Sequence, residues 1–156
     1  MRPRDYIHKF CARQEDNLRE FLRFPMRFAG SLYASNSHIL ICTEDDQTVQ
    51  AGHSMELLKG VDLIIKAMER AAPGIPLKCE MPYKLDDGGY RNWQLVCIEN
   101  SWFRARYIEL ISGFPDIEIC VNPDRPLAMS FFHFRGGWGA LMPCELPAAE
   151  FLTKEQ

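Results

Sequence analysis

The chain has 156 residues, 47% of them hydrophobic and 25% charged, which suffices for one core and is too short for two ordinary domains. Its net charge of -3 argues against a uniformly basic nucleic-acid-binding protein but allows local basic patches. No apolar run approaches the roughly 18 residues of a membrane-spanning helix, and the N-terminus is charged where an export signal is apolar. We therefore expect one soluble, cytoplasmic domain without a membrane partner.

The first 28 residues are locally basic, with seven Lys and Arg against four Asp and Glu, a balance of 7 minus 4, or +3. Apolar residues recur at helical spacing after Pro3, so we expect a helix over about 3–14. Its apolar face would consist of Tyr6, Ile7, Phe10 and Cys11. The opposite, basic face is open to two interpretations, a solvated surface or a binding surface.

From Phe21 to Thr43, aromatic and β-branched residues broken by small polar residues predict two or three short strands. Apolar spacing then predicts a second helix over 61–72, ended by Pro73 and Gly74. Residues 76–99 have the pattern of a hairpin with its turn at 86–89. A third helix over 103–112 and three strands over 116–121, 126–134 and 138–144 complete an α+β order with antiparallel sheets.

No residue pattern indicates an enzyme. The six cysteines lie 18 to 37 positions apart without a CxxC pair, and the four histidines form no HExxH motif, so we expect no metal and no cofactor. No phosphate-binding glycine loop occurs, and Ser35 to His38 has the pattern of a polar turn, not of a nucleophile elbow. Three tryptophans are candidates either for stacking on nucleic-acid bases or for core packing. They are Trp93, Trp102 and Trp138.

Two segments carry a family resemblance. Residues 32–40 share Ala34, His38 and Leu40 with the Ala-Thr-Asp-Gly-His-Arg-Leu segment of bacterial DNA polymerase III β subunits, the sliding clamps. Residues 103–110 read Phe-Arg-Ala-Arg-Tyr-Ile-Glu-Leu and resemble the clamp's Phe-Asn-Ala-Arg-Tyr-Leu-Leu-Asp helix. Residues 141–146 are similar to its terminal Met-Pro-Met-Arg-Leu. The resemblance implies one clamp-like domain over 1–146 with an insertion at about 47–75, followed by a tail over 147–156.

The resemblance also implies a fold and two kinds of site. The fold would have antiparallel sheets with the helices packed on one face, and basic helix residues would face duplex DNA without sequence specificity. These candidates are Arg2, Arg4, Lys9, Arg13, Arg104 and Arg106. An apolar pocket would bind linear peptides of replication or repair proteins. Its candidates are Ser35, Ser37, His38, Leu40, Leu141, Met142, Pro143 and Leu146.

The leading hypothesis is therefore a non-enzymatic clamp-fold protein that binds DNA, replication proteins or both. A phage or another mobile element is a candidate source of such a protein. The alternative is a single-domain interaction or inhibitory module that does not encircle DNA; a small hydrolase would need a reactive side chain that the sequence does not offer. A ring needs about six such domains, so we expect a head-to-tail homo-oligomer. Its peptide pocket would join 35–40 of one copy to 142–146 of the next, with the tail either docked there through Phe151 and Leu152 or mobile.

Overall fold

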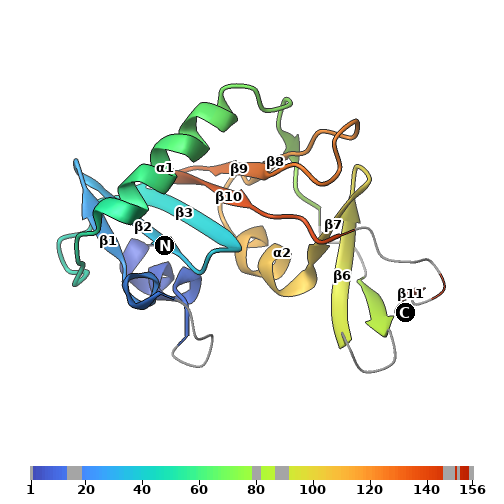
Figure 1. Cartoon of the computed structure of the whole chain (residues 1–156), viewed down its shortest axis with the longest axis horizontal. Helices are drawn as coiled ribbons and strands as arrows, with labels where there is room; N and C mark the ends of the chain where they lie inside the picture. The colour runs from blue at the N-terminus through green and yellow to red at the C-terminus, as the bar shows by residue number, and fades with distance from the viewer. Residues whose placement is uncertain are drawn as a thin grey trace.

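A long antiparallel sheet organises the chain. The structure, a computed structural model, describes residues 2–13, 19–78, 82–86, 92–145, 150 and 152–154. Among these residues, seven strands form one sheet in the order β1-β2-β3-β10-β9-β8-β4 (Figure 1). The strands are β1 (Met26–Phe28), β2 (Ser31–Ser35), β3 (Ile39–Glu44), β10 (Gly137–Leu141), β9 (Ser130–Phe134), β8 (Glu118–Cys120) and β4 (Ile75–Pro76). Of the two or three strands expected between 21 and 43, three are present, and the three expected after 115 are confirmed; the bounds differ, since β3 extends to Glu44 and β10 begins at Gly137.

A second, smaller sheet lies at one end of the first (Figure 1). Its order is β11-β5-β6-β7, and all its pairs are antiparallel. The strands are β11 (Leu152–Lys154), β5 (Tyr83–Asp86), β6 (Asn92–Ile98) and β7 (Ser101–Arg104). Strands β5 and β6 confirm the predicted pairing within 76–99, whereas turn residues 87–89 lie outside the described residues. Residues 103 and 104 belong to β7, so the third helix begins two residues later than predicted.

Two α-helices are present in the described part of the chain, α1 (Met55–Met68) and α2 (Ala105–Ser112). The helix α1 begins six residues before the predicted start at 61 and ends four before the predicted end at 72. Its first turn is fixed by Ser54, whose hydroxyl accepts a hydrogen bond from the backbone N–H of Leu57 at 3.4 Å. Neither helix is long and apolar enough to cross a membrane.

The predicted first helix over 3–14 is wrong. The described residues of this segment form two short 3-10 turns, η1 (Pro3–Asp5) and η2 (Ile7–Phe10), and a further turn, η4 (Glu20–Arg23), follows later. The helical path breaks at Tyr6, whose φ of -139° is far from helical values. The same spacing of apolar residues suits 3-10 turns, because these also bring residues three apart to one side. Tyr6, Ile7 and Phe10 are accordingly buried, as expected.

Both faces of the long sheet are covered, so the expectation that the helices pack on one face is wrong. Every residue of β3 from Ile39 to Thr43 is buried, which places apolar side chains on both faces. On one face, Leu57 and Val61 of α1 share a core with Leu40. On the other, α2 and the η2 turn pack into the main core with Ile39 and Ile41. Figure 1 shows α1 and α2 on opposite sides of the strands.

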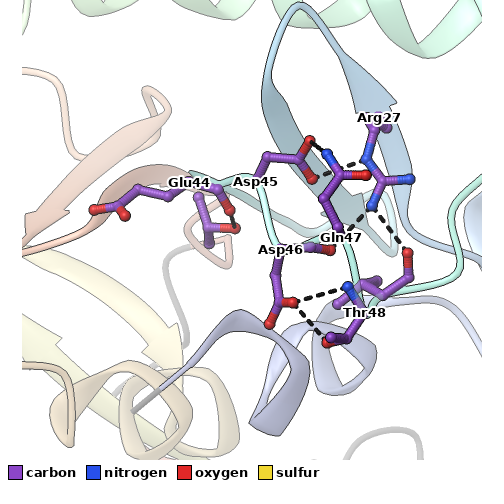
Figure 2. A network of polar contacts seen from close by, with 8 residues as sticks. Arg27, Glu44, Asp45, Asp46, Gln47 and Thr48 are labelled. Atoms are coloured by element: carbon purple, nitrogen blue, oxygen red, sulfur yellow. Dashed lines mark hydrogen bonds and ion pairs between the residues drawn. The ribbon is translucent and has the colours of Figure 1, made fainter.

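A polar network fixes the loop that leads from β3 to α1 (Figure 2). Arg27 donates through Nε to the carboxylate of Asp45 at 2.8 Å, and through Nη2 to the backbone carbonyls of Asp46 and Val49 at 3.0 and 2.9 Å. The carboxylate of Asp46 accepts hydrogen bonds from the backbone N–H and hydroxyl of Thr48 at 3.0 and 2.6 Å. These bonds close the loop against the edge strand β1.

Candidate functional site

A cleft rich in positive charge lies where the η2 turn meets α2. Its volume is about 360 Å³. Its described lining, which we term the basic cleft, is His8, Lys9, Cys11, Ala12, Arg13, Arg23, Asn36, Arg106, Tyr107 and Leu110. Four of these side chains are permanently cationic and none is acidic. The cleft is therefore a local electropositive site on a chain with a net charge of -3.

Hydrogen bonds hold one arginine of the cleft in place. Arg106 donates through Nη2 to the hydroxyl of Tyr107 at 2.6 Å, and its guanidinium carbon lies 4.6 Å from the centre of the Tyr107 ring. The side-chain amide of Asn36 donates to the same hydroxyl at 3.1 Å. The side-chain oxygen Oδ1 of Asn36 accepts hydrogen bonds from the backbone N–H groups of His38 and Ile39. The turn after β2 therefore also holds Asn36 in its place in the cleft. This preorganisation lowers the entropy lost when the Arg106 side chain binds a ligand.

Arg23 is a cation of the cleft lining that the sequence analysis did not single out. Its Nε is buried and has no hydrogen-bond partner among the described residues. A buried donor without an acceptor is costly, and charged donors are the costliest. Arg23 was not among the sequence candidates, although it belongs to the basic N-terminal segment; only the fold of η4 brings it here.

The cleft also contains a thiol that is chemically quiet. Burial raises the pKa of Cys11 to about 12, so this thiol is protonated at neutral pH. Because the thiolate is the nucleophile, Cys11 is not activated for covalent chemistry. Among the described residues, no group of three or more His, Cys, Asp or Glu side chains is placed to hold a metal ion. The chemistry that the cleft offers is the binding of negative charge.

The structure brings together four of the six predicted DNA-binding residues. Lys9, Arg13 and Arg106 line the cleft, and Arg104 lines an adjoining pocket that also includes Arg106. The other two are not in the cleft lining. The backbone N–H of Arg2 donates to the Asp5 carboxylate at 2.9 Å. Arg4 lies beside Asp46, where hydrogen bonds from Thr48 and then the proximity of Arg4 lower the pKa of the Asp46 carboxyl group.

The predicted peptide-binding segments meet within one chain. Antiparallel pairing of β3 with β10 places Leu141 opposite Ile39, and the Met142 N–H donates to the carbonyl of His38 at 2.9 Å. A small pocket of about 40 Å³ is lined by six of the candidates, Ser35, Ser37, His38, Leu40, Leu141 and Met142. Pro143 is not in this lining, and Leu146 lies outside the described residues. The expectation that two copies must supply the two halves is therefore wrong, because neighbouring strands of one sheet supply both.

A larger apolar groove adjoins this pocket. We term it the α1 groove; it has a volume of about 380 Å³ and runs between α1 and the turn after β2. Its described lining is Arg19, Phe21, Leu22, Ser35, Ser37, Leu40, Glu56, Leu57, Gly60, Val61 and Ile64. Arg19 and Glu56 form an exposed ion pair of 3.1 Å within this lining. The groove wall from α1 was not predicted, because the sequence reading treats 47–75 as an insertion outside the family pattern.

The described end of the tail does not lie in the pocket. Residues 152–154 form β11 and pair with β5 in the second sheet, with Leu152 opposite Leu85 and Lys154 opposite Tyr83. The Lys154 ammonium lies 5.9 Å from the centre of the Tyr83 ring. Of the two alternatives for the tail, docking in the pocket through Leu152 is therefore wrong, and Phe151 falls outside the described residues. An edge strand with an unpaired side offered the tail backbone hydrogen bonds that an apolar pocket cannot supply.

Comparison with family models, with curated proteins and with solved structures finds no match to this chain.

Proposed function

We propose that the chain is a non-enzymatic, clamp-fold protein that binds duplex DNA through the phosphates, without sequence preference, at the basic cleft. The observation that carries this proposal is the described cleft lining, which has four permanent cations and no carboxylate. The presence of three arginines in this lining, Arg13, Arg23 and Arg106, supports it, because a guanidinium is a suitable partner for a phosphate. The resemblance of residues 103–110 to the sliding-clamp helix supports the clamp part of the proposal, since Arg104 and Arg106 belong to that segment.

Phosphate contacts carry no sequence information, so this mode of binding is expected to be similar for unrelated duplexes. Overall charge opposes it, since the chain is acidic. Local charge decides the outcome at short range, because exposed charges more than about 10 Å apart are largely screened at 0.1 M salt. The cations of one cleft therefore act together on a nearby phosphate group, while distant carboxylates contribute little.

The test compares two charge-matched variants by fluorescence anisotropy with short labelled duplexes of two unrelated sequences in about 0.1 M salt. One variant combines Lys9→Gln, Arg13→Gln and Arg106→Gln in the cleft. The control combines Lys59→Gln, Lys66→Gln and Arg70→Gln, which removes the same charge from exposed positions on and just after α1. We expect the cleft variant to lose about 10-fold or more in affinity for both duplexes, and the control to lose far less. Equal losses, or no binding by the unaltered protein, would overturn the proposal.

A second candidate function is a protein-interaction module, and the α1 groove favours it. The groove is apolar in its walls and continuous with the small pocket, since Ser35, Ser37 and Leu40 line both. Such a groove fits apolar side chains of a linear peptide, as replication and repair proteins would present, with the Arg19 and Glu56 pair available for polar contacts. This function does not require DNA and does not exclude it, because the groove and the cleft have separate linings.

A further inference from the structure

One face of the second sheet carries three aromatic rings and an arginine. Directly paired residues of an antiparallel sheet lie on the same face. The register pairs Leu95 with both Tyr83 and Arg104, and Cys97 with Trp102. Trp93 lies two residues before Leu95 and therefore on the same face. We term Tyr83, Trp93, Trp102 and Arg104 the aromatic face.

The aromatic face lies on the side of the sheet away from the main core. Val96 and Phe103 alternate with the residues of the aromatic face and belong to the main core on the other side. Between the rings, Leu85 and Leu95 are buried at 1% and 0% exposure, whereas the three rings remain partly exposed. The rings are thus held by packing and still reach the surface.

The ring contacts are specific. The guanidinium carbon of Arg104 lies 4.5 Å from the centre of the Trp93 ring, which is a cation–π distance. The rings of Tyr83 and Trp102 meet edge to face with their centres 5.1 Å apart. Planar side chains held in this way lose little conformational entropy when another planar group stacks on them.

A pocket of about 280 Å³ opens at Trp93 and Arg104. Its described lining is Trp93, Gln94, Arg104 and Arg106, without a carboxylate. Arg104 and Arg106 line this pocket together, and burial and then the nearby charge of Arg106 lower the pKa of Arg104. Like charges at short distance favour an anion between or beside them. Arg106 also lines the basic cleft, so the pocket and the cleft form one continuous cationic surface.

We propose that the aromatic face binds an unpaired nucleic-acid strand, with a base stacked on Trp93 and the adjacent phosphate bound by Arg104 and Arg106. This proposal rests on the proposed function, which makes DNA the ligand. It adds that the preferred DNA is a duplex with a single-stranded extension. Bases inside a duplex are stacked on each other, whereas unpaired bases expose a π-face to an aromatic side chain. Aromatic rings interleaved with cations are typical of surfaces for single strands, and the absence of carboxylates among the described lining residues disfavours a basic peptide.

The test measures binding of three labelled probes, a blunt duplex, the same duplex with an oligo-dT extension, and oligo-dT alone. The unaltered protein is expected to bind the extended duplex more tightly than the blunt one. Trp93→Leu should lower affinity for the extended duplex and for oligo-dT by about 5- to 150-fold for one lost stacking contact, and leave the blunt duplex unchanged. Trp93→Phe should keep most of the affinity, and Trp138→Phe on β10, in the other sheet, should change none of the three.

The outcomes separate this proposal from the proposed function. If the blunt duplex binds and Trp93→Leu changes no probe, or changes all three equally, the stacking proposal is overturned while the cleft proposal stands. If oligo-dT binds through Trp93 and the blunt duplex does not bind, the cleft proposal fails and stacking is supported. If the Trp93→Leu variant does not fold, a second variant tests the same proposal. It combines Trp102→Phe and Trp138→Phe, so that Trp93 is the one tryptophan left in the chain. Its Trp93 fluorescence should be quenched by oligo-dT; the absence of quenching would overturn the proposal.

Discussion

Burial keeps several ionisable side chains neutral in the folded chain. Burial is the main cause that raises the pKa of Tyr6, of Cys11 and of Tyr33 to about 12 each, with the negative charges of Glu44 and Asp5 adding to the effect on Tyr6. The ordinary values are 10.0 for tyrosine and 9.0 for cysteine. Between the ordinary and the raised values, the unfolded chain releases protons that the folded chain retains.

This difference predicts alkaline destabilisation. The stabilisation is complete below pH 9.0, the ordinary pKa of cysteine, and is lost as the pH rises toward about 12. The midpoint of urea unfolding, followed by circular dichroism, should therefore fall steadily over that range. Tyr33→Phe removes one of the groups and should make the decline shallower. A midpoint that stays constant up to pH 11 would contradict the assignment.

At the level of elements, α1 shows how far the sequence reading reaches. Apolar spacing predicts the helix, and its start at 55 is fixed by Ser54, a favourable N-cap residue that lies outside the predicted span. The packing position of α1 could not be predicted from spacing. Its apolar face packs against Leu40 and Ala140, which lie on two strands far apart in sequence. The N-terminal turns show the converse: their buried residues are predicted correctly, and their helix type is not.

The α1 groove gives a prediction for this element. A side chain at Gly60 would enter open space, since nothing beyond its chain neighbours and the backbone of its own helix lies within 4 Å of an added Cβ. Gly60→Ala and Gly60→Arg should both fold, with stability equal to or up to about 1 kcal/mol above that of the original helix. For peptides with apolar side chains taken from replication and repair proteins, Gly60→Arg should weaken binding about 10-fold or more, because it fills the groove, and Gly60→Ala should not. Isothermal titration would measure both; equal affinities would exclude the α1 groove as the peptide site.

At the scale of the whole molecule, the α+β class and the antiparallel pairing are predicted correctly, whereas the arrangement of layers is not. The clue to the second layer is the uninterrupted apolar run Ile39 to Cys42, which leaves no polar face on β3. The clamp resemblance predicts Lys9 and Arg106 on one DNA-binding surface, and both line the cleft. The position of Arg23 beside them could not be predicted, since it depends on the fold of η4. The same is true of the aromatic face, whose membership is decided by strand register.

The homo-oligomer remains a prediction from the clamp resemblance. Two of the sheet edges are partly occupied by the chain itself, β1 by Gly52 and β7 by Cys144, while β11 forms the edge next to β5. The β4 edge is only two residues long and contains Pro76, which has no N–H to donate. Sedimentation velocity at rising concentration should show a species heavier than the 18.0 kDa chain. A single 18.0 kDa species at all concentrations would contradict a ring and favour the single-domain interaction module.

The central claim is that the basic cleft binds DNA phosphates, and the salt dependence of duplex binding tests it most directly. Four cations that each neutralise one phosphate predict a slope of log K against log salt of roughly -3 to -4, at about 0.9 per contact. The variant with Lys9→Gln, Arg13→Gln and Arg106→Gln should reduce the slope by almost one for each cation removed, while the charge-matched control with Lys59→Gln, Lys66→Gln and Arg70→Gln should keep it. A slope near zero in the unaltered protein, or an unchanged slope in the folded cleft variant, would contradict the claim.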